Sequence, residues 1–302
     1  MATWSSEIKL VGAGGEPVDF ARTLLSHGVA DLPPNEIAPD GSRLSTVLAA
    51  GHGAWLVEVV SDGPGRARLR ASATAPPPAD RPALIGQMRR MLRLDEDLSD
   101  FYLLAGADPA LAWVAAGAGR MMRSPTVFED LVKTICTTNC AWSATVRMVT
   151  ALVTELGPLA AGGGGRRAFP GPARLADAGD AFFRDVVRAG YRGPYLRALA
   201  EDVASGRLDL EALGDPDLAD QEVAERLLEI AGVGPYAMAH MMMLLGRYGR
   251  LILDSWTRPK YRLLSGRRRI TDKGIERAFR RYRQFAGLAF WLTLTEDWLP
   301  AQ

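Results

Sequence analysis

The stretch Leu227–Ala237, which reads LLEIAGVGPYA, joins two predicted helices through a Gly-Val-Gly turn. Glycine at positions 232 and 234 allows φ above zero and leaves no side chain over the turn. The amides of the turn and of the next helix N-terminus can therefore face an anion, as in a phosphate-binding site. A plain αα-hairpin with glycine as the helix C-cap explains the same turn. The turn alone leaves both interpretations open.

A single carboxylate follows the second helix of this hairpin. Leu251, Ile252 and Leu253 form an apolar approach to Asp254, which we expect at the entrance of another helix. Capping that helix is one role for Asp254, and the capping amides would keep the carboxylate ionised. Pro259 disfavours an unbroken helix from Asp254 onward, so we expect an irregular first turn.

The bulk composition limits the class of protein. A chain of 302 residues with 48% hydrophobic content can bury a large core, in one large domain or two ordinary ones. The N-terminus does not read as a secretory signal and the apolar runs are too short to span a bilayer, so we expect a cytoplasmic protein without a membrane partner. Two cysteines, Cys136 and Cys140, cannot supply the four thiolates of an iron–sulfur cluster, and no Cys/His cluster indicates zinc.

Charge is distributed unevenly along the chain. The net charge is +1, yet residues 247–283 contain 13 Lys or Arg against Asp254, Asp272 and Glu276. The rest of the chain is acidic. A basic block beside the glycine hairpin suits a polyanionic partner, whereas a solvated helix face is the alternative explanation.

The chain divides into a sheet-forming part and a helical part. Strand-like runs at Glu7–Val11, Leu44–Ala49, Ala54–Val60 and Arg66–Ala73 surround a helical interlude near residues 17–27. The triproline that ends at Pro78 marks a break, and helical patterns follow almost to the end. We therefore predict an α+β fold, with a small N-terminal antiparallel sheet domain over residues 1–78 and a large helical domain over residues 79–302.

At the hairpin and Asp254, the chain resembles the helix-hairpin-helix superfamily of DNA glycosylases. Ile135–Asn139, ICTTN, resembles the base-wedge segment of 8-oxoguanine DNA glycosylases, and Gly190–Arg192 resembles their second wedge loop. Leu92–Leu98 and Phe169-Pro170 also fall where that family has comparable motifs. The resemblance extends from about residue 90 to 296, and the N-terminal sheet agrees only in outline.

The resemblance implies an enzyme that flips a damaged base out of double-stranded DNA into a pocket. It implies that Asn139 fills the vacated space, while Tyr191 and Arg192 kink the duplex and contact the orphaned base. A helix N-cap, loop packing and a solvated charge are the alternative roles of these three residues. The phosphate-binding residues that we expect are Gly232, Val233, Gly234, Arg258 and Lys260. No cofactor is expected, although the family also allows a monovalent or divalent ion at the hairpin backbone carbonyls.

The resemblance also implies the chemistry. Cleavage of the N-glycosidic bond develops oxocarbenium character, so Asp254 is expected to stabilise the transition state and to orient or deprotonate the attacking water. Bifunctional members of the family carry a lysine where this chain has Tyr236, and a phenol cannot form their Schiff base. We expect a monofunctional enzyme unless Lys260 or Lys133 reaches the sugar.

The base pocket is expected to contain Tyr236, His240, Trp256 and Trp291, although residues such as the last three are more often found in the core than in a pocket. Aromatic walls suit electron-deficient alkylated purines, as in the 3-methyladenine glycosylase branch. Hydrolytic removal of 8-oxoguanine is the alternative activity, and a non-catalytic binder of damaged DNA is the alternative class. In each case, we expect a monomer.

Overall fold

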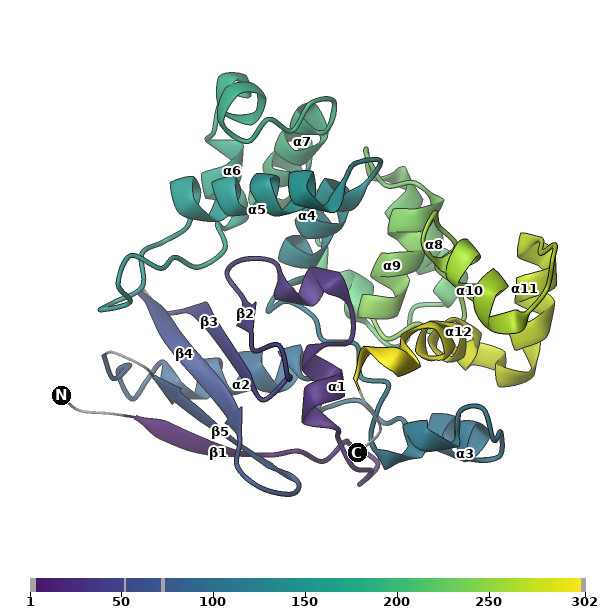
Figure 1. The fold of residues 1–302 in the computed structure, drawn as a ribbon. Helices are drawn as coiled ribbons and strands as arrows, with labels where there is room; N and C mark the ends of the chain where they lie inside the picture. The colour runs from purple at the N-terminus through teal and green to yellow at the C-terminus, as the bar shows by residue number, and fades with distance from the viewer. Residues whose placement is uncertain (1–3, 52, 72–73, 300–302) are drawn as a thin grey trace.

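The structure is a computed structural model of the chain, and it describes residues 4–51, 53–71 and 74–299. It has the predicted α+β composition, with a five-stranded antiparallel sheet and a larger body of helices (Figure 1). The order of the strands in the sheet is β1-β5-β4-β3-β2. Their bounds are β1 Ser5–Lys9, β2 Glu36–Ile37, β3 Arg43–Ala50, β4 Gly53–Ser61 and β5 Arg66–Ala71.

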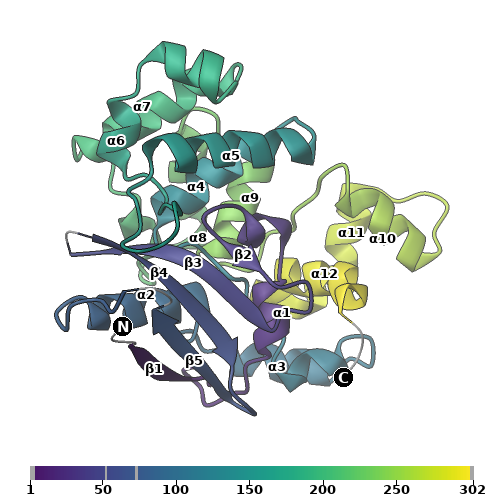
Figure 2. The same cartoon turned by 60° about the vertical axis from the view of Figure 1, so that its left-hand side comes forward.

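Side-chain alternation decides which face of the sheet is buried. In β5, Ala67, Leu69 and Ala71 are buried, while the arginines between them are exposed. Helix α2, Arg81–Met91, packs on this buried face (Figure 2). A small cluster on the other face joins β3 and β4 to Ala160 and Ala168. The packing of the sheet therefore continues past residue 78.

The helical part is built around α4, Val127–Thr137, which is buried from Val127 to Cys136. It contacts α5, α7 and α9. The remaining helices have these bounds: α1 Phe20–Leu24, α3 Ser99–Gly106, α5 Trp142–Leu156, α6 Pro172–Ala176, α7 Arg192–Ala204, α8 Asp220–Glu229, α9 Pro235–Leu244, α10 Thr257–Ser265, α11 Asp272–Phe279 and α12 Ala286–Thr295. Short helical turns are η1 Gly28–Asp31, η2 Ala112–Ala116, η3 Phe182–Val186, η4 Glu211–Gly214, η5 Arg280–Phe285 and η6 Glu296–Trp298.

The N-terminal segment also packs into the helical part. Helix α12 lies beside α1 in both ribbon views, and Val29 and Leu32 belong to the main helical core.

Among the helices of the described residues, none has the length and apolarity that a membrane crossing requires.

Candidate active site

The predicted hairpin is formed by α8 and α9. Gly232 has φ +91°, and a Cβ added there would lie 2.8 Å from Cδ2 of Tyr195. This position therefore requires glycine for both its conformation and its packing. Gly234 does not use the positive φ that glycine allows, since it is the N-cap of α9 with φ −99°. A Cβ at Gly234 would meet no atom within 4 Å, so the surface over the turn is open.

The hairpin presents several backbone donors to this open surface. Val233 N donates to Ile230 O at 3.0 Å and closes the turn. Within the residues that the structure describes, four further amides of the turn and the α9 N-terminus form no hydrogen bond: Gly232, Gly234, Tyr236 and Ala237. Because these donors lie at the positive end of the α9 dipole, the hairpin can bind an anion.

Asp254 lies at the start of α10, half-buried behind the buried Ile252. Its Oδ1 accepts hydrogen bonds from the amides of Trp256 at 2.8 Å and Thr257 at 2.7 Å, and Thr257 Oγ1 accepts from Asp254 N at 2.8 Å. The expected irregular first turn is present, since α10 begins only at Thr257. Oδ2 has no hydrogen-bond partner among the described residues, so the carboxylate is oriented by one oxygen and can face a substrate with the other.

Tyr236 lies near this carboxylate, in the first turn of α9. Its phenol oxygen is 3.4 Å from Oγ1 of Thr137, at the end of α4. Burial raises the pKa of Tyr236, the hydrogen bond with Thr137 partly offsets this rise, and the charge of Asp254 adds a smaller upward effect. The phenol is therefore neutral at pH 7, and it cannot form the Schiff base that an amine at this position would form.

The two lysines considered as substitutes for an amine at position 236 are both in ion pairs. Lys133 Nζ is 2.7 Å from Oε1 of Glu129, and its side chain is 0% exposed. Lys260 Nζ is 2.5 Å from Oδ2 of Asp297. Each amine is thus held by a carboxylate within the protein.

The aromatic residues predicted for the base pocket form two contacting groups. The rings of Tyr236 and His240 have centroids 6.2 Å apart. Trp256 is 40% exposed and packs against the buried Trp291 with centroids 5.7 Å apart, and Trp298 contacts both. His240 and Trp291 are buried, as their core interpretation requires, and Trp256 is accessible immediately after Asp254 in the chain.

The two predicted wedge loops lie side by side. Asn139 is exposed at the tip of the α4–α5 loop with φ +46°, a left-handed conformation that asparagine tolerates. Its Nδ2 donates to the hydroxyl of Tyr191 at 3.3 Å, and that hydroxyl lies 3.5 Å from Thr138 O. Tyr191 is also exposed. Two polar side chains from distant segments therefore project together from one edge of the molecule.

Arg192 differs in exposure from Asn139 and Tyr191, the two other predicted wedge residues. It is buried, and its guanidinium donates to Thr138 O, to Thr138 Oγ1 at 3.3 Å and to Ala189 O at 3.3 Å. It also stacks on Tyr191 with its Cζ 4.5 Å from the ring centroid. Arg192 thus joins the two wedge loops to each other.

Replacing Arg192 with alanine is expected to destabilise the protein. The buried carbonyl of Ala189 and the partly buried carbonyl of Thr138 would lose a charged donor, at a cost of about 2–3 kcal/mol in the free energy of unfolding. Urea unfolding measures the effect. The control is Arg184→Ala, which removes an exposed arginine paired only with its neighbour Asp185. Identical unfolding curves for the two variants would contradict this role of Arg192.

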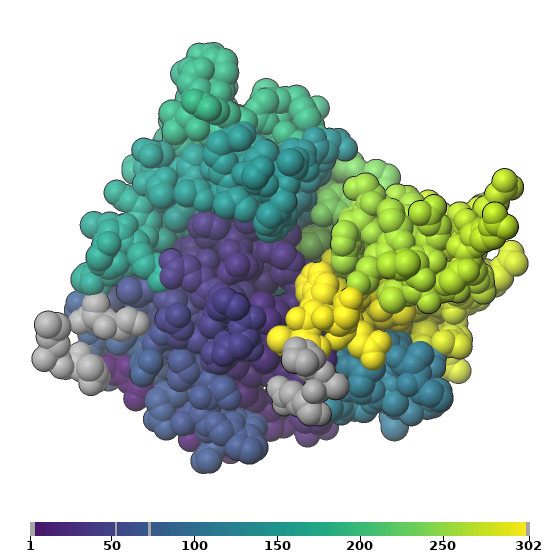
Figure 3. All heavy atoms as spheres, viewed as in Figure 1, coloured from purple at the N-terminus to yellow at the C-terminus, as the bar shows by residue number. Residues whose placement is uncertain are grey.

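The basic block forms a lobe around α10 and α11. Figure 3 shows this yellow-green lobe projecting from the molecule, with a notch between it and the teal helices. Four cations of the block are in ion pairs: Arg247 with Asp220, Arg258 with Asp272, Lys260 with Asp297 and Arg281 with Asp108. The predicted phosphate ligands Arg258 and Lys260 are therefore already paired with carboxylates in this structure.

A hollow of about 570 Å³ lies between this lobe and the start of α9. Its charged lining consists of Arg250, Arg258, Arg280, Arg283, Asp272 and Glu276, beside Pro235 and Tyr236 of the hairpin. Arg280 and Arg283 form no ion pair with a described residue. The excess of arginine makes this hollow suitable for an anion next to the hairpin amides.

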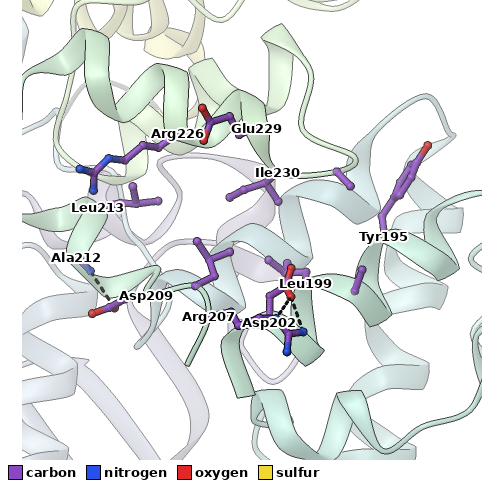
Figure 4. Close-up of a pocket in the computed structure, with 13 residues that line it drawn as sticks. Tyr195, Leu199, Asp202, Arg207, Asp209, Ala212, Leu213, Arg226, Glu229 and Ile230 are labelled. Atoms are coloured by element: carbon purple, nitrogen blue, oxygen red, sulfur yellow. Dashed lines mark hydrogen bonds and ion pairs between the residues drawn. The ribbon is translucent and has the colours of Figure 1, made fainter. Parts of the chain in front are cut away.

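A second hollow, of about 710 Å³, lies between α7 and α8 beside the other end of the hairpin turn (Figure 4). Arg207 in it is held by Asp202 at 2.9 Å. Its carboxylates, Asp202, Asp209 and Glu229, outnumber its arginines, Arg207 and Arg226. This carboxylate-rich lining is unsuited to a polyanion. The hollow beside the start of α9 is therefore suited to an anion, and the hollow between α7 and α8 is not.

Two further aromatic positions were not identified from the sequence. His27 in the N-terminal segment contacts His240 with ring centroids 5.4 Å apart. Trp142, at the start of α5, is 49% exposed and its ring lies over Gly28. No motif or spacing signals either residue, because each contact joins segments far apart in the chain.

No group of three or more His, Cys, Asp or Glu side chains suited to a metal occurs among the described residues.

Comparison of the whole fold identifies similar solved structures. No protein-family model matches the chain, and no curated protein matches it in sequence. A 3-methyladenine DNA glycosylase from Archaeoglobus fulgidus has a TM-score of 0.74 and 17% identity, with 98% of this chain and 100% of that chain covered. An 8-oxoguanine glycosylase/lyase from Clostridium acetobutylicum, in its apo form, has a TM-score of 0.73 and 19% identity, with coverages of 96% and 95%.

A shorter solved structure also matches. The 3-methyladenine DNA glycosylase of Schizosaccharomyces pombe, in complex with abasic DNA, has a TM-score of 0.51 and 21% identity, and covers 68% of this chain and 99% of its own. At these identities, the similarity shows a shared fold. The chain therefore shares its fold with these three solved glycosylase structures.

Proposed function

We propose that this protein is a base-excision DNA glycosylase, which flips a damaged base out of duplex DNA and hydrolyses its N-glycosidic bond. The observation that carries the proposal is the Asp254 carboxylate, which two amides orient through Oδ1 while Oδ2 is left without a partner. It follows a hairpin with four unbonded amides, in a fold shared with DNA glycosylases. The proposed partner is damaged double-stranded DNA, bound in the cytoplasm by one copy of the chain.

In this mechanism, Asp254 acts on the sugar. The bond to the base breaks with positive charge developing on the sugar ring, and a fixed carboxylate on one face stabilises that charge. The same carboxylate orients a water molecule or accepts its proton as the water attacks C1′. Neutral Tyr236 lines the approach to the base and forms no covalent intermediate, so the product is an abasic site in an intact strand.

The wedge loops are proposed to fill the space that a flipped base leaves in the duplex. Extruding a nucleotide costs a few kcal/mol, and less for a damaged base. Asn139 is exposed and fixed by Tyr191, so it can enter the space that the base leaves. Arg192 is proposed to position this pair from beneath, because its own guanidinium is committed to Thr138 and Ala189. The energy of DNA binding by the hairpin then offsets the unstacking.

Arg280 and Arg283 are proposed to contact DNA phosphates that run past the hairpin. The double variant Arg280→Gln with Arg283→Gln is expected to bind duplex DNA with a weaker salt dependence. The slope of log K against log salt falls by about 0.9 for each phosphate that the protein no longer neutralises. Fluorescence anisotropy over a salt series measures this slope.

The matched control is Arg207→Gln with Arg226→Gln, which neutralises two arginines in the carboxylate-rich hollow. Those changes should leave the slope as it is in the wild type. An unchanged slope in the Arg280 and Arg283 variant would remove this hollow from the DNA interface.

Alkylated purines, such as 3-methyladenine, are the proposed substrates, because the site is aromatic and the nearby Tyr236, His240 and Trp256 carry no charge at pH 7. The 8-oxoguanine glycosylase/lyase of Clostridium acetobutylicum has nearly the same TM-score as the 3-methyladenine enzyme, so 8-oxoguanine is the second candidate. Defined duplexes, some containing an alkylated purine and others containing 8-oxoguanine opposite cytosine, distinguish the two. If 8-oxoguanine is the only base released, 8-oxoguanine becomes the first candidate substrate and alkylated purines become the second.

A further inference from the structure

Residues 26–28 of the N-terminal segment are fixed against the helical part. Met122 N donates to Ser26 Oγ at 2.9 Å, and Nε2 of His27 lies 2.6 Å from Met122 O. Trp291 Nε1 donates to Ser26 O at 2.8 Å, which connects the segment to α12. The segment is thus held from both sides by backbone and side-chain hydrogen bonds.

His27 continues the aromatic group of the candidate base pocket. Its ring meets that of His240 edge to face, with an interplanar angle of 80°, and His240 in turn contacts Tyr236. Tyr236 joins this chain of rings to Thr137 beneath the wedge loop and lies within the field of Asp254. The rings therefore connect the N-terminal segment to the candidate catalytic carboxylate.

Trp142 covers the same segment from the solvent side. A Cβ on Gly28 would lie 3.4 Å from Cη2 of Trp142, so the indole rests directly on the glycine. The indole is half-exposed and follows Asn139 of the wedge loop by three residues.

The hydrogen bond to Met122 fixes the tautomer of His27. A carbonyl only accepts, so Nε2 carries the proton and Nδ1 of the neutral ring is an acceptor. Burial lowers the pKa of His27 to about 4, with the charges of Lys133 and Arg93 acting in the same direction, against the effect of the Met122 bond. Burial also lowers the pKa of His240 to about 3. Both imidazoles are neutral at pH 7.

Two nitrogens of this pair are unsatisfied. Nδ1 of His27 and Nε2 of His240 are buried and form no hydrogen bond with a described residue. A buried polar group without a partner is costly to keep, and most such groups in folded proteins are paired. A ligand with an N–H group would satisfy the acceptor on His27.

We propose, on the basis of the function proposed above, that His27 is a specificity-determining residue whose Nδ1 accepts a hydrogen bond from the exocyclic amine of an extrahelical adenine-type lesion. On the Hoogsteen edge, adenine offers N7 as acceptor and the N6 amine as donor, whereas guanine offers only the acceptors N7 and O6. An acceptor at His27 therefore favours 3-methyladenine and repels O6 of 7-methylguanine. The N-terminal part of the chain thereby takes part in base selection.

The test uses duplex DNA treated with a methylating agent, which contains both lesions. Mass spectrometry of the released free bases gives the ratio of the single-turnover rates for 3-methyladenine and 7-methylguanine, after subtraction of an enzyme-free blank. His27→Phe keeps an aromatic ring without an acceptor and is expected to lower this ratio at least tenfold. His27→Leu, which also has no acceptor, should lower it as well, so a folding defect in one variant does not decide the result.

Two measurements separate base selection from a structural effect. Affinity for a duplex with a stable abasic analogue should be unchanged in both variants, because no base is present to contact His27. Tyr102→Phe is the control, since it removes another buried hydrogen-bonding atom without a partner, the Tyr102 hydroxyl in α3, and should keep the wild-type ratio.

Two different results would overturn the inference and are distinguishable from each other. If the wild type releases both bases and the ratio is unchanged in both His27 variants, His27 does not select the base although the glycosylase function stands. If the wild type releases no base from any damaged duplex, the proposed function fails, and the inference fails with it.

Discussion

Replacing Asp254 with asparagine is expected to slow base release by two to four orders of magnitude, while affinity for damaged duplex DNA changes by less than tenfold. The asparagine oxygen can still accept the amides of Trp256 and Thr257, so the start of α10 keeps its geometry. The negative charge that stabilises the developing oxocarbenium ion is lost, and the water loses its base. Single-turnover rates and anisotropy on one preparation measure both quantities.

Asp297→Asn is the matched control for this change. Asp297 is an exposed carboxylate of η6 that pairs with Lys260 of α10, and it has no proposed role in chemistry. Its variant should release bases at the wild-type rate. If Asp254→Asn also kept that rate, Asp254 would not be the catalytic carboxylate. Binding of damaged DNA by a wild type that releases no base would instead indicate the alternative class, a non-catalytic binder.

The second large effect is expected at Tyr236. The wild type should leave abasic sites that break only after alkali, and Tyr236→Lys should produce strand breaks without alkali, at least tenfold above the wild-type level. A lysine there would place an amine near Asp254 in a largely buried setting, where desolvation lowers the amine pKa and favours the nucleophilic form. Denaturing gels and borohydride trapping of the Schiff base measure the gain.

Tyr236→Phe controls for the loss of the phenol itself. This variant keeps the ring against His240 and should give neither strand breaks nor a trapped adduct. Borohydride trapping of the wild type would contradict the account, because it would require an amine such as that of Lys133 or Lys260 to leave its ion pair and reach the sugar.

The hairpin and Asp254 could be predicted because their signals are local. A Gly-Val-Gly turn between two helices, followed by an apolar run and one carboxylate, is contained in residues 227–254. The structure confirms the helices on both sides of the turn, and it places the Asp254 carboxylate against the amides of Trp256 and Thr257 just before and at the start of α10. The sequence could not show that Gly234 has an ordinary φ, because glycine is compatible with either sign.

Side-chain partners that are distant in sequence could not be predicted. Arg258 pairs with Asp272 and Lys260 with Asp297, so neither cation is as available as its position in a basic block suggested. Arg192 was expected to contact DNA, and its burial between the wedge loops depends on contacts with Thr138, 54 residues away. Long charged side chains reach many partners, and the pattern along the chain does not select among them.

The strands of the sheet could be predicted only where a local sequence pattern is long enough. β3, β4 and β5 lie at predicted runs because each has a clear period or apolar content over six or more residues. The last two residues of the run predicted to end at Ala73 lie outside the described residues. β2 has only Glu36 and Ile37, too few residues for a pattern.

His27 was not identified as a site residue because its significance comes from Met122 and His240, both far along the chain.

The most direct test of the central claim is the release of free base from DNA by the wild-type protein. Duplex DNA carrying methylated purines is incubated with excess protein, and the soluble fraction is assayed by mass spectrometry beside an Asp254→Asn sample and a blank. The account predicts free 3-methyladenine above the blank with the wild type, and none above it with Asp254→Asn. Binding of the damaged duplex with no base released by the wild type, from these or from 8-oxoguanine duplexes, would contradict it.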